Sequence, residues 1–300
     1  VRDRAARSPA FGVTTMTDNH RIETILREAT GRLAAVSDSA RLDAELLLAR
    51  AIDVTRTYLF AHPEDSLDDL ALQRFEKSLA RRIAGEPMAY IHGTREFWSL
   101  ELMVTPATLV PRPETELLVD LALREIPRRA EWHILDLGTG SGAIAVVIAK
   151  ERMSCHVTAT DISEAALAVA RQNARQFELP NIEFLAGDWA EPVSGRKFDV
   201  IVSNPPYIRA SDDALAALVA EPATALVAGE DGLDAIRVLA RDCKALLRGH
   251  GVLLFEHGAD QESEVAALLK QYGWRDVHCQ KDYAGLPRVT IARANPATRR

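Results

Sequence analysis

The chain has 300 residues, of which 47% are hydrophobic and 26% are charged, and its formal net charge is −7. This composition is typical of a soluble globular protein, and no stretch approaches the roughly 18 consecutive apolar residues of a membrane-spanning helix. Proteins that grip duplex nucleic acid usually carry a basic face or a high pI, whereas the pI here is near 5.7. We therefore expect no membrane partner and no direct binding to duplex DNA.

The first residues and the cysteines bear on the cellular compartment. Residues 1–16 mix Arg, Asp, Pro and Ser without the apolar core of a secretory signal. We expect them to be a disordered extension or a product of start-codon choice before Met16. The cysteines, Cys155, Cys243 and Cys279, are widely spaced and form no CxxC pair, which favours reduced thiols in a cytoplasmic protein.

Residues 17–84 are expected to form a small helical domain. Apolar residues recur there at helical spacing, as in Ile22, Ile25, Leu26 and Leu33. Ser37 or Asp38 could cap a second helix, and Ser66 could begin a third. No strand-like alternation interrupts this region.

Residues 85–110 are expected to form a β-hairpin linker, because a Gly-Glu-Pro sequence ends the helical pattern and residues 88–104 alternate in part between apolar and polar. Residues 111–300 then form the largest domain. It opens with Pro111-Arg112-Pro113, whose prolines fix an extended segment. The acids of Glu114-Thr115-Glu116 suit the first turn of a following helix.

Strands and helices alternate through the rest of the chain. Strands are predicted at His133–Leu137, His156–Thr160, Ile182–Leu185, Val200–Ser203, Val252–Glu256, Asp276–Gln280 and Val289–Ala292. Helices are predicted at Ala143–Lys150, Glu164–Phe177, Leu233–Leu247 and Glu262–Tyr272. The alternation predicts an α/β fold with a doubly wound, Rossmann-like, mainly parallel sheet of seven strands. A short loop joins the last two strands, so one of them is expected to be antiparallel.

A glycine-rich loop follows the first of these strands directly, with the sequence Asp136-Leu137-Gly138-Thr139-Gly140-Ser141-Gly142. Glycines remove the Cβ atoms that would block a ligand lying across the end of the strand. The GxGxG spacing differs from the GxGxxG dinucleotide fingerprint and favours S-adenosylmethionine, which has no pyrophosphate. Taken alone, the loop could also be a tight turn without a ligand.

Asp161 and Trp189 follow the next two strands. The Asp161 carboxylate could accept hydrogen bonds from both ribose hydroxyls, as in other nucleoside-binding α/β folds, or it could cap the next helix. Trp189, after Gly187 and Asp188, could stack on adenine or could be a core tryptophan. With the glycine loop in register, nucleoside binding is the favoured interpretation.

The fourth predicted strand leads into Asn204-Pro205-Pro206-Tyr207. An amide or aniline-type NH2 group is a poor nucleophile because its lone pair is delocalised. The Asn204 side-chain oxygen and the Pro205 carbonyl could hold both N–H bonds, aim the lone pair at a sulfonium methyl and stabilise the developing positive charge. Tyr207 could pack over the planar group, and the tetrad could otherwise be only a structural turn.

The whole set resembles the release factor glutamine methyltransferase (HemK/PrmC) family over nearly all the chain after Met16. The resemblance rests on the helical region, the glycine loop, the Asn204–Tyr207 tetrad and two more particular elements, Pro111–Glu116 and Glu221-Pro222. It implies a class I methyltransferase fold. The implied activity is methyl transfer from S-adenosylmethionine, giving S-adenosylhomocysteine, to N5 of the glutamine in the Gly-Gly-Gln motif of class I peptide chain release factors, a step tied to translation termination.

The resemblance also implies roles for individual residues. The cofactor contacts would be Gly138, Thr139, Gly140, Ser141, Gly142, Asp161, Trp189 and Asn204. The glutamine would be held by Asn204, Pro205, Pro206 and Tyr207, with Asn204, Pro205 and Tyr207 as the catalytic positions. The helical domain would dock the release factor, and we expect a monomer.

Other residues have competing interpretations. Cys155-His156 and His278-Cys279 could suggest a metal, but neighbours on a strand point to opposite faces, so no metal is expected. His257 could reach the ligand crevice or be a loop residue, and Glu221 could close a lid or be the first acid of a helix.

Two other functions remain open. The same tetrad could serve an N6-adenine-type DNA or RNA amino-methyltransferase, which would need a basic groove and an extruded base. A cofactor-binding regulatory protein without catalysis would have no use for two aimed acceptors.

Overall fold

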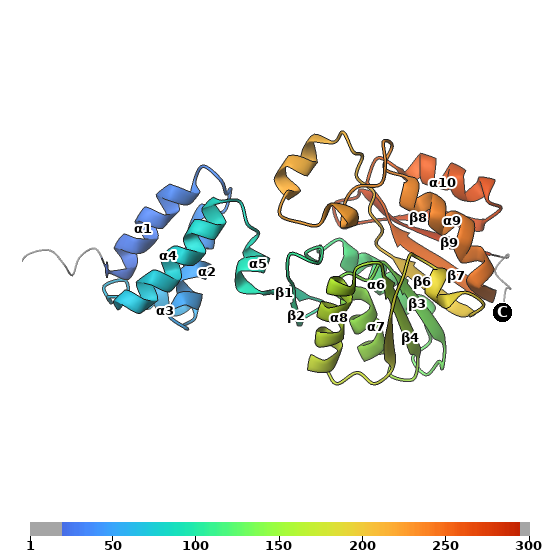
Figure 1. The fold of residues 1–300 in the computed structure, drawn as a ribbon, viewed down its shortest axis with the longest axis horizontal. Coiled ribbons are helices and arrows are strands. Elements are labelled where there is room, and N and C mark those ends of the chain that lie inside the picture. The colour runs from blue at the N-terminus through green and yellow to red at the C-terminus, as the bar shows by residue number, and fades with distance from the viewer. Residues whose placement is uncertain (1–19, 295–300) are drawn as a thin grey trace, which may run out of the picture. The chain divides into compact units, whose positions relative to one another are not determined.

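The computed structural model describes residues 20–294, which form two compact units that meet in sequence at Ile91 and His92 (Figure 1). The extension expected at residues 1–16 lies outside the described residues. No helix between residues 20 and 294 is both long and apolar enough to cross a membrane.

The first unit is helical. Its helices are α1 (Ile22–Leu33), α2 (Ala40–Ala51), α3 (Arg56–Ala61), α4 (Asp69–Ile83) and α5 (Met88–His92). Their apolar faces meet in one core, in which Leu26, Leu48 and Phe75 are buried. Asp68 caps α4 by accepting a hydrogen bond from Ala71 N at 2.7 Å.

Two buried acids reinforce the helical unit. Asp43 on α2 pairs with Arg82 on α4 at 2.7 Å. Glu45 lies between Arg41 and Arg56, each at 2.6 Å. Because both carboxylates are buried and paired, removing an arginine would leave a charge uncompensated.

The expected hairpin is shorter than the alternation suggested. Strands β1 (Thr94–Phe97) and β2 (Leu100–Met103) pair antiparallel, which confirms a hairpin. The residues before it form the one-turn helix α5 instead, where the Pro87 carbonyl accepts from two following amides. Five residues are too few for periodicity to separate a helical turn from a strand.

The second unit contains the seven-stranded sheet, in the order β5-β4-β3-β6-β7-β9-β8. Its strands are β3 (His133–Leu137), β4 (His156–Asp161), β5 (Ile182–Ala186), β6 (Phe198–Ser203), β7 (Leu247–Glu256), β8 (Arg275–Lys281) and β9 (Pro287–Arg293). β9 runs antiparallel to both of its neighbours, which confirms the expectation of one antiparallel strand at the end of the chain.

Helices cover both faces of the sheet (Figure 1). They are α6 (Thr115–Glu125), α7 (Ala143–Glu151), α8 (Glu164–Gln176), α9 (Asp234–Leu246) and α10 (Glu262–Gln271). Ile134 on β3 packs with α6, α7 and α8, whereas the next residue, Leu135, packs with α9 and α10. Successive side chains point to opposite faces, so a strand covered on both sides is apolar throughout.

The register of the central strands positions the site. β3 pairs in parallel with β4 and β6, and Leu137 lies opposite both Thr160 and Ser203. The carboxyl ends of the three strands are therefore level, and β3 is where the strand order reverses. Open α/β sheets bind ligands at such a point.

Candidate active site

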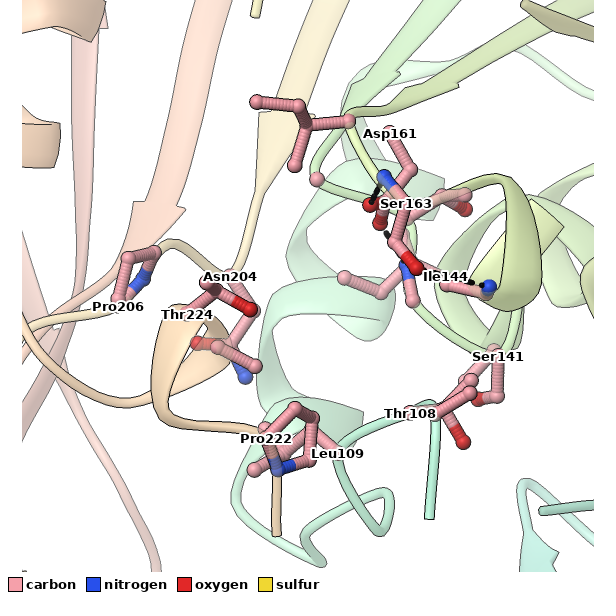
Figure 2. Close-up of a pocket in the computed structure, with 18 of the residues that line it drawn as sticks. Thr108, Leu109, Ser141, Ile144, Asp161, Ser163, Asn204, Pro206, Pro222 and Thr224 are labelled. Carbon is pink, nitrogen blue, oxygen red and sulfur yellow. Dashed lines mark hydrogen bonds between the residues drawn. The ribbon is translucent and has the colours of Figure 1, made fainter. Parts of the chain in front are cut away.

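A cavity of about 360 Å³ lies at the carboxyl ends of β3, β4 and β6 (Figure 2). This volume is within the usual range for a small-molecule site, roughly 300–1,000 Å³. The walls include Gly138, Thr139, Gly140, Ser141, Asp161, Trp189, Asn204 and Pro206. Residues predicted from three separate motifs thus meet around one cavity.

The glycine loop forms one wall through its backbone. Gly138 and Gly140 have φ values of 71° and 57°, in the left-handed region that glycine adopts without strain. The amides of Gly138 and Thr139 donate to the Thr160 carbonyl at 3.0 and 2.9 Å, which pins the loop to the end of β4. A Cβ on Gly140 would meet nothing within 4 Å.

Gly142 has a different position from the other predicted loop residues. It is the N-cap of α7, with φ 81°, and it is not among the residues that line the cavity. A Cβ there would lie 3.0 Å from the Ala170 Cβ on α8. Gly142 therefore permits close packing of two helices behind the cavity.

Asp136 lies buried beneath the loop. Its Oδ2 atom accepts from Thr139 Oγ1 at 2.6 Å, whereas Oδ1 has no hydrogen-bond partner among the described residues. The backbone of Ala145 lowers the pKa of this carboxyl only slightly. Burial raises the pKa of Asp136 to about 7, and Thr139 opposes the rise. This carboxyl therefore titrates near neutral pH.

Asp161 lines the cavity at the end of β4. Its Oδ2 atom accepts from Gly140 N and its Oδ1 atom from Ser163 N, both at 2.8 Å. Ser163 is the N-cap of α8, so Asp161 is not the helix cap considered from the sequence. A carboxylate oxygen has about two acceptor sites, so each oxygen can accept another donor from the cavity.

Trp189 is both a cavity wall and a core contact. It lines the cavity and is partly buried against the apolar cluster beneath α9. Its φ of 45° is unusual for a residue with a side chain, and its carbonyl accepts from Thr160 Oγ1 at 3.0 Å. The two roles weighed from the sequence are therefore compatible.

The tetrad separates into two groups. Pro206 lines the large cavity, whereas Pro205 and Tyr207 line a second cavity of about 230 Å³. Asn204 lines both. Asn204 is therefore the tetrad residue that could contact a ligand in either cavity.

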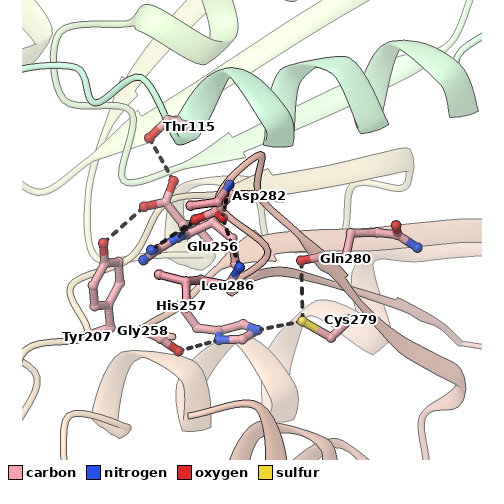
Figure 3. A network of polar contacts seen from close by, with 11 residues as sticks. Thr115, Tyr207, Glu256, His257, Gly258, Cys279, Gln280, Asp282 and Leu286 are labelled. Carbon is pink, nitrogen blue, oxygen red and sulfur yellow. Dashed lines mark hydrogen bonds and ion pairs between the residues drawn. The ribbon is translucent and has the colours of Figure 1, made fainter. Parts of the chain in front are cut away.

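Two residues that the sequence analysis did not assign to the site support the tetrad. Asn204 Nδ2 donates to Thr115 Oγ1 at 3.0 Å, and Thr115 Oγ1 donates to Glu256 Oε2 at 2.7 Å. The Tyr207 hydroxyl donates to Glu256 Oε1 at 3.0 Å (Figure 3). Glu256 ends β7 and is only 1% exposed. In the sequence, the one sign that it could belong to the site was its position as an acid at the carboxyl end of an apolar strand.

Burial governs the ionisation of this network. It raises the pKa of Glu256, against the lowering effect of the Thr115 and Tyr207 hydrogen bonds. It also raises the pKa of the Tyr207 phenol, as does the neighbouring Glu256 carboxylate. Tyr207 therefore stays a neutral hydrogen-bond donor.

Glu221 joins the two segments that flank both cavities. Its carboxylate accepts from Val110 N at 3.0 Å and from Arg112 Nη2 at 2.5 Å. Leu109 and Arg112 line both cavities, as does Ala225, which follows Glu221. Glu221 is not a helix N-terminal acid; it holds the loop that follows the tetrad against the segment that precedes α6.

Comparison with known proteins places this geometry in a family. Residues 24–93 match the model of the PrmC N-terminal domain, and residues 114–233 match that of the methyltransferase small domain. A release factor glutamine methyltransferase from Coxiella burnetii is 45% identical over 272 residues, covering 89% of this chain and 98% of that protein. The Escherichia coli K12 protein of the same name is 44% identical over 271 residues, covering 89% and 97%. The chain belongs to the release factor glutamine methyltransferase family.

Solved structures share the fold of this family member. A methyltransferase from Pyrococcus furiosus matches with a TM-score of 0.51 at 20% identity, covering 73% of this chain and 99% of that one. The hMettl16 catalytic domain, solved with the MAT2A 3'UTR hairpin 6, matches with a TM-score of 0.53 at 16% identity, covering 74% and 84%. The class I methyltransferase fold expected from the sequence is confirmed.

Other candidate residues of this family member lie away from the two cavities. His257 is buried, and its Nε2 atom lies 2.9 Å from Thr290 Oγ1. Cys155 is buried with Sγ 3.2 Å from the Ala130 carbonyl. Among residues 20–294, one group has donors spaced for a metal ion, in the helical unit: His62, Glu64 and Asp65.

Proposed function

We propose that this protein transfers a methyl group from S-adenosylmethionine to the side-chain amide nitrogen of the glutamine in the Gly-Gly-Gln motif of class I peptide chain release factors. Membership of the release factor glutamine methyltransferase family supports the reaction and the substrate class. The observation that carries the proposal is that Asn204 lines both cavities while its amide nitrogen is anchored on Thr115, which lines the larger one.

The larger cavity suits S-adenosylmethionine in its volume and in the groups that line it. Gly138 and Gly140 leave room along the loop, and Asp161 offers acceptors to two ribose hydroxyls. Trp189 offers an aromatic face to the adenine. When bound, this cofactor supplies an electrophilic methyl group on a sulfonium centre.

The second cavity holds the glutamine side chain in this proposal. The Asn204 Oδ1 atom and the Pro205 carbonyl each accept one N–H of the substrate amide, which orients the nitrogen and stabilises positive charge as it develops. Tyr207 packs against the planar amide, and its raised pKa excludes it as a base at neutral pH. The two acceptors therefore supply the catalytic contribution of the tetrad.

The helical region, residues 17–84, docks the body of the release factor in this proposal, and the enzyme acts as a cytoplasmic monomer. The match of residues 24–93 to the PrmC N-terminal model supports a family-specific role for this region. The net charge of −7 supports a protein substrate over duplex DNA. Neither role requires a metal.

The test is a methyl-transfer assay with labelled S-adenosylmethionine, in which unmodified release factor and duplex DNA are offered in parallel. Label should appear on the release factor and be lost when its Gly-Gly-Gln glutamine is replaced by alanine. Label on DNA alone would favour an adenine amino-methyltransferase and overturn the proposal.

A further inference from the structure

A single buried carboxylate contacts both sides of the tetrad. Glu256 accepts from Thr115 through one oxygen and from Tyr207 through the other (Figure 3). Thr115 in turn accepts from the Asn204 amide. These residues come from three separate elements: β7, the first turn of α6 and the segment after β6.

The chemistry of these groups gives the hydrogen-bond chain one direction. The Thr115 hydroxyl gives its single hydrogen to Glu256 Oε2. The lone pairs that remain on Thr115 Oγ1 can only accept, so the NH2 end of the Asn204 amide must face it. Glu256 thus selects between the two orientations of the Asn204 amide, which would otherwise have nearly the same shape.

The selected orientation is the one that the reaction needs. With Nδ2 held on Thr115, the Asn204 Oδ1 atom accepts no hydrogen bond from the described residues. An amide turned by 180° would present its NH2 group to the substrate NH2, so that two donors would face each other. That arrangement could neither hold the substrate nitrogen nor stabilise positive charge on it.

We propose that Glu256 is a positioning residue, acting through Thr115, which fixes the Asn204 side-chain oxygen toward the methyl-accepting nitrogen. This inference rests on the proposed function of the tetrad. The second oxygen of Glu256 also accepts from the Tyr207 hydroxyl, so one carboxylate positions two of the side chains that line the smaller cavity, Asn204 and Tyr207. The other charged groups that act on Glu256 are Arg288, which favours its ionised form, and Glu114, which opposes it.

Substitutions that preserve shape separate positioning from simple structural support. Thr115→Val keeps the branched shape and removes the hydroxyl, whereas Thr115→Ser keeps the hydroxyl. Glu256→Gln keeps the size, but its NH2 group can donate to Thr115 and reverse the chain. Thr158→Val is the matched control, because Thr158 is a buried threonine that donates to a carboxylate, Glu183, at 2.8 Å outside both cavities.

The full-length variants would be assayed with labelled S-adenosylmethionine and unmodified release factor. We expect Thr115→Val and Glu256→Gln to lower kcat by about 10–100-fold, with the dissociation constant of S-adenosylmethionine changed by less than about threefold, a change of under 1 kcal/mol. Thr115→Ser should recover most of the lost kcat. Thr158→Val should leave kcat within about twofold of the unaltered enzyme, even though it too loses a hydrogen bond to a carboxylate.

A second readout does not depend on turnover. The side-chain amide resonances of Asn204 can be assigned as the pair missing from Asn204→Asp. They should shift in Thr115→Val and Glu256→Gln and keep their positions in Thr158→Val. Unchanged resonances together with normal kcat in Thr115→Val would overturn the inference.

The outcomes distinguish this inference from the proposed function on which it rests. If the unaltered enzyme labels no release factor, the proposed function fails. If it labels the release factor and Thr115→Val does so at the same kcat, only the positioning role fails. A loss of thermal stability without a selective loss of kcat would likewise reduce Glu256 to a structural role.

Discussion

The glycine-loop wall of the larger cavity is formed mainly by backbone from one short stretch of chain, whereas the tetrad is held by side chains that come from distant parts of the chain. Around the glycine loop, main-chain amides hold the structure: Thr160 O accepts from the loop, and Asp161 accepts from Gly140 N and Ser163 N. Around the tetrad, Thr115, Asn204 and Glu256 form a chain that spans 141 residues of sequence.

The difference suggests a division of labour. A backbone surface changes little when a side chain is replaced, which suits the binding of a cofactor whose shape never varies. A chain of buried hydrogen bonds fixes the direction of each donor, which suits the alignment of a weak nucleophile. We therefore expect substitutions on the loop side to affect cofactor binding and substitutions on the tetrad side to affect kcat.

Asn204→Ala should give the largest effect and the sharpest separation of the two sides. Loss of one of the two acceptors should lower kcat by about 10²–10³-fold, while the dissociation constant of S-adenosylmethionine changes by less than about fivefold, or roughly 1 kcal/mol. Single-turnover kinetics and equilibrium binding would measure the two quantities. Equal losses in both would show that Asn204 belongs to the cofactor site alone.

Asp136→Asn should remove the pH-dependent loss of stability that ionisation of this buried carboxyl causes. The pKa of Asp136 is raised from 3.8 to about 7, so its favourable contribution is complete below about pH 4 and is lost as pH rises to about 7. The asparagine cannot ionise but can still accept from Thr139. The free energy of unfolding of the variant, relative to the unaltered protein, should therefore rise by roughly 2–4 kcal/mol from pH 4 to pH 8. Denaturant unfolding at several pH values would measure it, and a difference independent of pH would contradict the buried ionisation.

Asp161→Ala should weaken cofactor binding by about 10–100-fold, because a carboxylate that accepts two ribose hydroxyls contributes charge-assisted hydrogen bonds of about 1.5–3 kcal/mol. At saturating S-adenosylmethionine, kcat should fall only a few-fold. Glu183→Ala on the neighbouring strand β5 serves as the control, since that carboxylate lies outside the cavity. An unchanged dissociation constant would remove the ribose role.

Glu221→Ala should have the smallest effect, and we expect it to affect both cavities. It leaves Arg112 and the Val110 amide without their shared acceptor, at a cost of about 1–2 kcal/mol in unfolding free energy, since Arg112 is 32% exposed and water screens the pair. The Michaelis constant for the release factor should rise a few-fold because Arg112 lines both cavities. Arg112→Ala should give a similar loss, and a double variant no worse than either single one would confirm that the two act as a pair.

The part of the site around the glycine loop could be predicted from the sequence because its motifs are local. The glycine loop, Asp161 and Trp189 each follow a strand whose apolar run is plain in the sequence. Gly138 to Ser141 of the loop line the cavity, as do Asp161 and Trp189. Local spacing could not show that Gly142 faces Ala170 instead of the cavity, because that depends on how α7 packs on α8.

The side-chain network around the tetrad could be predicted only in part. The tetrad itself is contiguous, but Thr115 reads as a helix-start residue and Glu256 as the end of a strand, and only the sheet order brings them to Asn204. The same limit applies to short elements: α3 buries Leu59 alone, and α5 has a single turn, so neither carries enough periodicity to be recognised.

The most direct test of the central claim is the position of the methyl group on the product. Unmodified release factor would be incubated with this protein and S-adenosylmethionine, digested and sequenced by tandem mass spectrometry. We predict one added methyl group on the side-chain nitrogen of the Gly-Gly-Gln glutamine, formed about 10²–10³-fold more slowly when Asn204→Ala replaces the unaltered enzyme. A methyl group on any other residue, or none with a competent cofactor-bound enzyme, would contradict the account.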